Sequence, residues 1–129
     1  MIRLAQDKDM LTTPYVFNAG VATAMAKAGA DIVVCHLGLT TGGAIGAETA
    51  LKLSAVPAMV DEWSESALKV NKDIIVLVHG GPVAEPDDAE YVLKNTANCH
   101  GFSGALSMER LPTERALTEQ TKRFKSVAF

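Results

Sequence analysis

A run of apolar, mostly β-branched residues that ends in a histidine and two glycines constrains the fold of this chain more than any other segment. Residues 74–78 read Ile-Ile-Val-Leu-Val, and His79, Gly80, Gly81 and Pro82 follow directly. An apolar run without polar alternation is typical of a strand that is buried on both faces, as in parallel sheets covered by helices. In such proteins, ligands bind just beyond the carboxyl ends of the strands. The His-Gly-Gly turn is therefore the first candidate for a site.

Apolar segments alternate with helical patterns along the whole chain. The sequence predicts strands over residues 11–17, 30–37, 74–78 and 101–106, of which the last is the weakest. It predicts helices over residues 1–10 and 18–28, from Ser54 to about Val70, from near Pro86, and from near Pro112. Strands that alternate with helices favour right-handed crossovers and a parallel sheet. The expected fold class is α/β, with one helix followed by four βα units.

Local signals indicate where the helices begin and end. Asn18 is a residue type that caps helix N-termini, and Gly29 is expected to stop the helix that Asn18 starts. Ser54 is the expected cap of the long third helix. That cap places Pro57 in the first turn, where a missing N–H costs little. Trp63 lies in the apolar stripe of this helix and is expected in the core or in an interface.

The composition limits the class of protein. The 129 residues, 48% of them hydrophobic, fit one domain over residues 1–129. The net charge of −3 arises from interspersed charges and gives no basic footprint for nucleic acid or an anionic membrane. The most basic stretch, residues 122–125, complements the dipole at the end of a predicted helix, with an anion-binding patch as the alternative.

Membrane and secretory signals are missing from the sequence. No apolar run approaches the roughly 20 residues of a membrane span, and the N-terminus reads as a helix rather than a signal peptide. Cys35 lies in a predicted buried strand and Cys99 just before another. Free thiols in a reducing compartment are the default for such cysteines, so we expect a cytoplasmic location.

Four βα units fit two architectures. They make a small open sheet, or they make half of an eight-stranded barrel, which typically needs about 250 residues. The chain opens with a helix that no strand precedes, as would a chain entered midway. The pattern alone leaves both architectures open.

Five segments, at residues 12–18, 28–34, 38–46, 78–89 and 101–114, together carry a resemblance to a known family. The most distinctive are Leu-Thr-Thr-Gly-Gly at residues 39–43 and Ser-Met-Glu-Arg-Leu-Pro at residues 107–112. The chain resembles, over nearly its whole length, the phosphoenolpyruvate-hydrolase-like TIM-barrel family. That family includes TIM-barrel signal transduction proteins and the C-terminal domain of plant tobamovirus-resistance proteins.

The resemblance implies that the chain matches the second half of the family domain. Its strands would be the fifth to eighth of a TIM barrel, and Met1 would correspond to an internal position. A natural start and a truncation both remain open. The family implies a small phosphorylated or keto-acid ligand at the carboxyl ends of the strands. A phosphoenolpyruvate- or pyruvate-type hydrolase or lyase activity is implied by the family name.

Two histidines are the candidate catalytic residues. His36 and His79 each end a predicted strand, and these strands are expected to be neighbours. Either imidazole is suited to general acid or base chemistry or to metal ligation, and a hydrogen-bonded structural role is the alternative. His100 precedes its strand and is expected at the opposite, stability face. No residues are predicted as metal ligands, because nearby carboxylates lack a tight ligand spacing, and a divalent cofactor stays open.

The loops after the strands supply the candidate ligand-binding residues. Glycines allow backbone N–H groups to approach an anion, and an arginine binds phosphate or carboxylate through two nitrogens. Loops rich in small residues also close as lids over bound ligands. The candidates are Thr40, Thr41, Gly42, Gly43, Gly80, Gly81, Ser107, Glu109 and Arg110. The alternatives are a tight turn at Gly80–Gly81, an ordinary flexible connection at residues 40–43, and an ion pair from Arg110 to Glu109 or Glu114.

Half a barrel leaves two unpaired sheet edges and an apolar inner face. We therefore expect the chain to associate as a homo-oligomer, with a small anionic ligand and with neither nucleic acid nor membrane as partner. The alternative functions are a non-catalytic module for ligand sensing or protein interaction, and an inactive half-barrel fragment.

Overall fold

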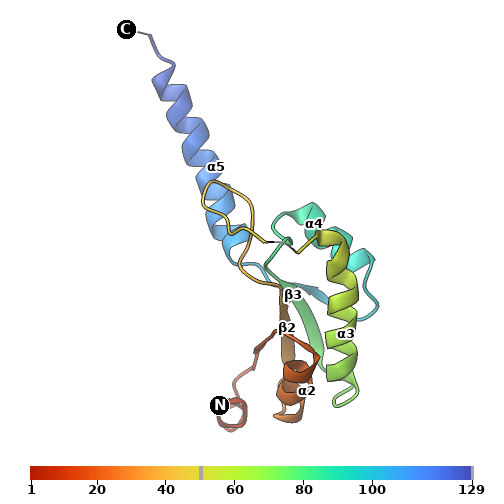
Figure 1. Cartoon of the computed structure of the whole chain (residues 1–129). Coiled ribbons are helices and arrows are strands. Elements are labelled where there is room, and N and C mark those ends of the chain that lie inside the picture. Colours follow the sequence, from red (N-terminus) through yellow and green to blue (C-terminus); the bar gives the residue numbers. More distant parts are fainter. Residues whose placement is uncertain (50, 129) are drawn as a thin grey trace.

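The computed structural model describes residues 1–49 and 51–128 and has a single parallel sheet (Figure 1). The elements are α1 (Ile2–Gln6), β1 (Tyr15–Val16), α2 (Ala19–Lys27), β2 (Ile32–His36), the 3-10 turn η1 (Leu53–Ala55), α3 (Val56–Leu68), β3 (Ile75–His79), α4 (Pro86–Lys94), β4 (Gly101–Phe102) and α5 (Leu106–Lys125). The strands are ordered β1-β2-β3-β4, and every neighbouring pair is parallel. The predicted α/β class, with one helix before four βα units, is confirmed.

The helices cover only one face of the sheet. Strand residues that are fully buried form a core with apolar residues of α2, α3 and α4; on the sheet these are Val16, Val33, Cys35, Val76 and Val78. The residues between them point to the other face, where Tyr15, Phe17 and Ile75 are 45%, 55% and 43% exposed. The prediction that strand 74–78 is buried on both faces is therefore wrong. The run is apolar on both sides, but only one side is covered by helices.

The predicted helix boundaries hold where the signal is local. Asn18 caps α2, because its Oδ1 accepts a hydrogen bond from the N–H of Val21 at 2.9 Å. Gly29 follows α2 with a φ of +92°. The prediction that Ser54 caps the third helix is wrong, since Ser54 lies inside η1 and Ala55 holds the N-cap position of α3. Pro57 does lie in the first turn of α3, as expected.

The C-terminal helix differs most from the prediction. The predicted strand over residues 101–106 is reduced to Gly101–Phe102, and α5 begins at Leu106 rather than near Pro112. Pro112 lies inside α5, which continues although a proline cannot donate the usual helical hydrogen bond. Of the described residues of α5, Leu111 is buried, whereas the apolar side chains of Leu117 and Phe124 are exposed. Figure 1 shows α5 extending away from the sheet.

None of the helices in residues 1–49 and 51–128 is both long enough and apolar enough to cross a membrane.

Candidate functional site at the carboxyl ends of the strands

The two candidate histidines lie side by side. His36 at the end of β2 and His79 at the end of β3 are partners in the register of the sheet, and their ring centroids are 5.0 Å apart. Tyr15 of β1 contacts both rings, edge-on to His36 at 4.7 Å and stacked on His79 at 5.2 Å. Phe17 lies 5.2 Å from His36. We call these four residues the aromatic–histidine cluster; it lies on the uncovered face of the sheet.

A backbone carbonyl fixes the tautomer of His79. His79 is only 7% exposed, and its Nδ1 is 2.6 Å from the carbonyl oxygen of Ser103, just after β4. A carbonyl oxygen only accepts, so Nδ1 carries the proton and donates it. In the neutral ring, Nε2 therefore holds a lone pair. No group in residues 1–49 or 51–128 is hydrogen-bonded to this Nε2.

The opposite tautomer holds for His36. Its Nδ1 accepts a hydrogen bond from the backbone N–H of Gly38 at 3.1 Å, so the proton of the neutral ring resides on Nε2. Burial, and secondly the neighbouring His79, lower the pKa of His36 below 6.5. Protonation of Nδ1 would also break the bond to Gly38. The cluster thus presents one ring nitrogen that accepts a proton and one that donates a hydrogen bond.

The glycines after β3 are required by the neighbouring loop. Gly80 and Gly81 have φ values of +74° and +58°, and an added Cβ would lie 2.3 Å from the carbonyl oxygen of Gly38 and 2.5 Å from that of Leu37, respectively. The N–H of Gly81 donates to the Gly38 carbonyl at 2.9 Å. Thr41 donates both its N–H and its hydroxyl to the Gly81 carbonyl. These hydrogen bonds hold the loop after β2 against the turn after β3. Gly80 and Gly81 therefore form the tight turn that the sequence left open as the alternative to an anion site.

The start of α4 is shielded against anions by carboxylates. Oδ2 of Asp88 accepts hydrogen bonds from the N–H groups of Ala84 and Glu85, and Asp87 lies in the same first turn. The start of α5 also has an acidic residue in its first turn, Glu109, but no side chain caps its N–H groups among the described residues. Ser107 lies in this first turn, and Ser103, just upstream, holds His79. Of the two helix starts that follow β3 and β4, that of α5 is therefore the better suited to an anion.

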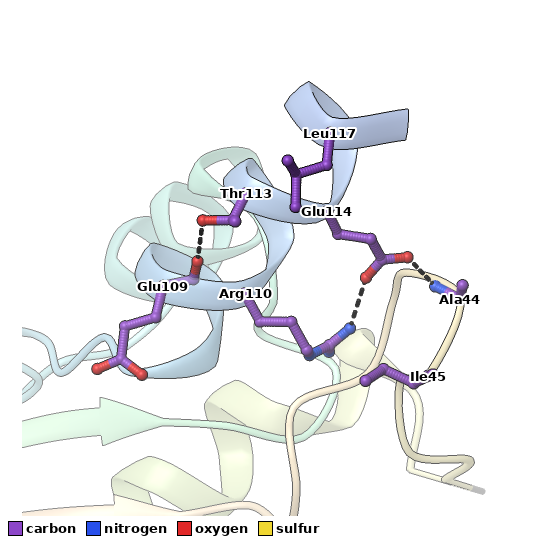
Figure 2. A pocket seen from close by; sticks show the side chains of 7 residues that line it. All are labelled: Ala44, Ile45, Glu109, Arg110, Thr113, Glu114 and Leu117. Atoms are coloured by element: carbon purple, nitrogen blue, oxygen red, sulfur yellow. Dashed lines mark hydrogen bonds and ion pairs between the residues drawn. The ribbon is translucent and has the colours of Figure 1, made fainter. Parts of the chain in front are cut away.

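Residues 39–46 form a loop rich in small residues, the small-residue loop, which Arg110 and Glu114 of α5 clamp (Figure 2). Arg110 donates to Glu114 at 3.0 Å and to the carbonyl of Gly42 at 3.1 Å, and Glu114 accepts from the N–H of Ala44. Gly43, at a φ of +75°, lies so close that a Cβ would be 2.6 Å from both side chains. The structure thus contains the Arg110–Glu114 ion pair that the sequence left as an alternative.

A cavity of about 480 Å³ lies between the small-residue loop and α5; it is lined by Ala44, Ile45, Glu109, Arg110, Thr113, Glu114 and Leu117. Neither His36 nor His79 lines it. In Figure 2, Glu109 points away from the Arg110–Glu114 pair. The predicted site residues therefore form two groups, one around the histidines and one at the clamp. Thr40, in the small-residue loop, is buried.

The described residues contain neither a metal-binding cluster nor an activated thiol. In residues 1–49 and 51–128, no three His, Cys, Asp or Glu side chains are grouped as a metal ion would require. Both cysteines are free, and burial raises the pKa of Cys35 to about 12 and raises that of Cys99. His100 accepts a hydrogen bond from the N–H of Val76 and lies outside the cluster.

Two features of the site were not predicted from the sequence. Tyr15 lies two residues before the end of the first predicted strand, so alternation along the strand would have placed it on the same face as Phe17. The contact of the Ser103 carbonyl with His79 could not be predicted, because every residue type has a backbone carbonyl.

The sheet, its one-sided helix layer and the site at its carboxyl edge define half of a TIM barrel, built of four βα units. The sequence profile of the phosphoenolpyruvate hydrolase-like family matches residues 1–127, and the chain belongs to this family.

Curated relatives are much longer than this chain. The ToMV susceptible protein tm-1(GCR26) of Solanum lycopersicum is 50% identical over 129 residues, which are 100% of this chain and 17% of the tomato protein. The ToMV resistance protein Tm-1(GCR237) of the same plant is 49% identical over the same shares. A putative transcriptional regulatory protein, y4pA, of Sinorhizobium fredii (strain NBRC 101917 / NGR234) is 31% identical over 98% of this chain and 21% of its own length.

Solved TIM-barrel enzymes share the fold. FabK from Thermotoga maritima matches with a TM-score of 0.52 and 25% identity, over 79% of this chain and 29% of that chain. The nitroalkane oxidase from Streptomyces ansochromogenes matches with a TM-score of 0.50 and 23% identity, over 91% of this chain and 35% of that chain. The latter shows the fold alone. In each case, this chain corresponds to about a third of a complete enzyme chain.

Proposed function

We propose that this chain binds a small phosphorylated or keto acid at the carboxyl ends of its strands, as one half of the mouth of a phosphoenolpyruvate-hydrolase-like barrel. The observation that carries the proposal is the pair of adjacent imidazoles with opposite tautomers. His36 offers an Nε2–H donor, and His79, a buried residue, offers an Nε2 lone pair. Such a pair fits an oxygen-rich ligand that both accepts a hydrogen bond and exchanges a proton.

The anionic end of the ligand would lie at the start of α5. The helix dipole and the first-turn N–H groups favour negative charge at a helix N-terminus, and Ser107 adds a hydroxyl. Thr41, Gly81 and Arg110 are assigned to the support of the loops, because their donors are engaged within the protein. This division leaves His36, His79 and Ser107 as the residues that touch the ligand.

The test is a titration followed by NMR chemical shifts, with phosphate, pyruvate and phosphoenolpyruvate as separate probes. We expect shifts at His36, His79 and the start of α5. His79→Gln and His36→Gln should each weaken affinity about 10- to 100-fold, because a hydrogen bond to a charged group is worth about 1.5–3 kcal/mol. His100→Gln is the control and should leave affinity unchanged. Equal losses in all three variants, or no shifts with any probe, would contradict the proposal.

A non-catalytic module is the second candidate. The names of the relatives describe virus resistance and a putative transcriptional regulator rather than an enzyme, which fits a role in signal transduction. The Arg110–Glu114 clamp and the hydrogen-bonded loops also favour a binding surface that is preformed. A sensor would bind one of the probes without turnover, whereas an enzyme would convert phosphoenolpyruvate or pyruvate and lose that turnover in His79→Gln.

The two free thiols support a reducing, cytoplasmic compartment.

A further inference from the structure

We propose that two copies of this chain close into one eight-stranded barrel, in which β4 of each copy lies beside β1 of the other, so that both His36–His79 pairs share one mouth. The proposal concerns the assembly and goes beyond the ligand site. A dimer of this kind forms whether or not a ligand binds, and the two proposals therefore fail separately.

The uncovered face of the sheet carries no charge. By register and alternation, ten strand and strand-end residues face this side: Tyr15, Phe17, Ile32, Val34, His36, Ile75, Leu77, His79, Gly101 and Ser103. None of them is Asp, Glu, Lys or Arg. Tyr15, Phe17 and Ile75 are about half exposed, although they are large and apolar. A contiguous exposed apolar face of this kind marks an interaction surface rather than a solvated one.

Both edges of the sheet are equally unprotected. Edge strands that stay exposed are normally blunted by charged residues, above all lysine. Residues 10–18 around β1 and residues 101–108 around β4 contain no charged side chain. On the β1 side, the carbonyls of Thr12 and Pro14 accept bonds from β2, so the backbone groups of Thr13 and Tyr15 point to the open side. The edges are therefore available for pairing with another parallel strand.

A second copy satisfies both edges at once. All four strands are parallel, so a two-fold axis along the strand direction places β1 of one copy beside β4 of the other without reversing any strand. Both junctions are identical under this axis, and the result has eight parallel strands and no edge, the closed form of a TIM barrel. A four-stranded unit supplies half of that number.

The position of α5 fits the same arrangement. In a barrel, the helix after a strand covers the junction with the next strand. Here the next strand after β4 is β1 of the second copy, and α5 extends away from its own sheet (Figure 1). Its Leu117 and Phe124 are exposed in a single copy and would be available to pack on the second copy. The site is incomplete without the partner, because one copy lines only half of the mouth.

The test is the oligomeric state of the unmodified chain and of two matched variants, by light scattering during gel filtration. Ile75→Lys places a charge on the uncovered face, and Tyr91→Lys places one on α4, outside it; the two residues are 43% and 37% exposed. We expect a dimer for the unmodified chain and for Tyr91→Lys. Ile75→Lys should raise the dissociation constant by at least about 100-fold, because an unpaired ammonium would be buried in the barrel.

Hydrogen exchange separates barrel closure from other dimers and needs no variant. In the unmodified chain, the amides of Thr13 and Tyr15 should be protected at high protein concentration and exchange quickly at low concentration. A monomer at all concentrations overturns the proposal. A dimer with unprotected edge amides, or a dimer that Ile75→Lys leaves intact, also overturns it.

Discussion

Thr12 and Asp31 hold each other through reciprocal hydrogen bonds that tie the approach to β1 to the start of β2. Oδ2 of Asp31 accepts from the hydroxyl of Thr12 at 2.5 Å and from its N–H at 2.9 Å, and the N–H of Asp31 donates back to the hydroxyl at 3.0 Å. Thr12 is buried at this junction. The pair therefore positions β1, which carries Tyr15 and Phe17 of the aromatic–histidine cluster.

The acid stability of the chain should depend on this pair. The hydroxyl of Thr12, and secondly its N–H, lower the pKa of Asp31 below 3.8. A carboxyl with a lowered folded-state pKa stabilises the fold above its unfolded-state pKa, and this contribution is lost as the pH falls through the folded-state value. Asp31→Asn should thus flatten the fall in unfolding free energy below about pH 4, as measured by urea unfolding. Asp73→Asn is the control, because the Asp73 carboxylate accepts no described hydrogen bond. An unchanged acid limb in Asp31→Asn would contradict this prediction.

A second pH effect is expected near neutrality and arises from His36. Burial, and then repulsion by His79, hold its folded-state pKa below 6.5. Between the two pKa values, the unfolded chain binds more protons than the folded chain, so stability rises with pH there and falls on acidification below about pH 6.5. His36→Gln should reduce the difference in melting temperature between pH 7.5 and pH 5.5. His100→Gln is the control, and an equal reduction there would contradict the assignment to His36.

The sequence predicted those parts of the fold that depend on short stretches of chain. The apolar run at residues 74–78, the cap at Asn18 and the stop at Gly29 are local signals, and each lies where it was expected. The predicted helix starts at Ser54 and near Pro112 are wrong, because the start of a helix depends on where the chain leaves the preceding element. The turn at Leu53–Ala55 precedes α3, and the chain enters α5 directly after β4. Tertiary context overrode propensity at both positions.

The site was predicted in part for the same reason. His36 and His79 were paired correctly, since both end strands and parallel neighbours share an edge. The catalytic role of these histidines remains a prediction. The engagement of Arg110 with Glu114 was left open, because an i,i+4 pair and an anion contact have the same sequence signature. The tautomers depend on the backbone of Gly38 and Ser103, which no residue type reveals.

The turn after β3 should separate backbone strain from steric contact. Gly38 and Gly80 both have positive φ, +103° and +74°, but a Cβ on Gly38 meets nothing within 4 Å, whereas one on Gly80 lies 2.3 Å from a carbonyl oxygen. Gly38→Ala should cost about 1 kcal/mol of unfolding free energy through φ alone. Gly80→Ala should cost at least about 1–3 kcal/mol more, because the neighbouring loop must move. Denaturant melts of both variants give the difference, and equal costs would rule out the steric explanation.

The clamp at Arg110 and Glu114 should control the small-residue loop without controlling the whole fold. Glu114→Ala removes the acceptor of the Ala44 N–H and the ion-pair partner of Arg110. The side chain of Glu114 is 25% exposed and that of Arg110 is 15% exposed. Hydrogen bonds to charged groups are worth about 1.5–3 kcal/mol, so exchange of the Ala44 amide should accelerate about 10- to 100-fold. Glu119→Ala, an exposed acidic residue on the same helix, should leave that exchange unchanged. The loop is held by α5 rather than by β3 alone. If the Ala44 amide exchanged equally in both variants, the hydrogen bonds from Thr41 to Gly81 would be sufficient to hold the loop, and the clamp would have no role in it.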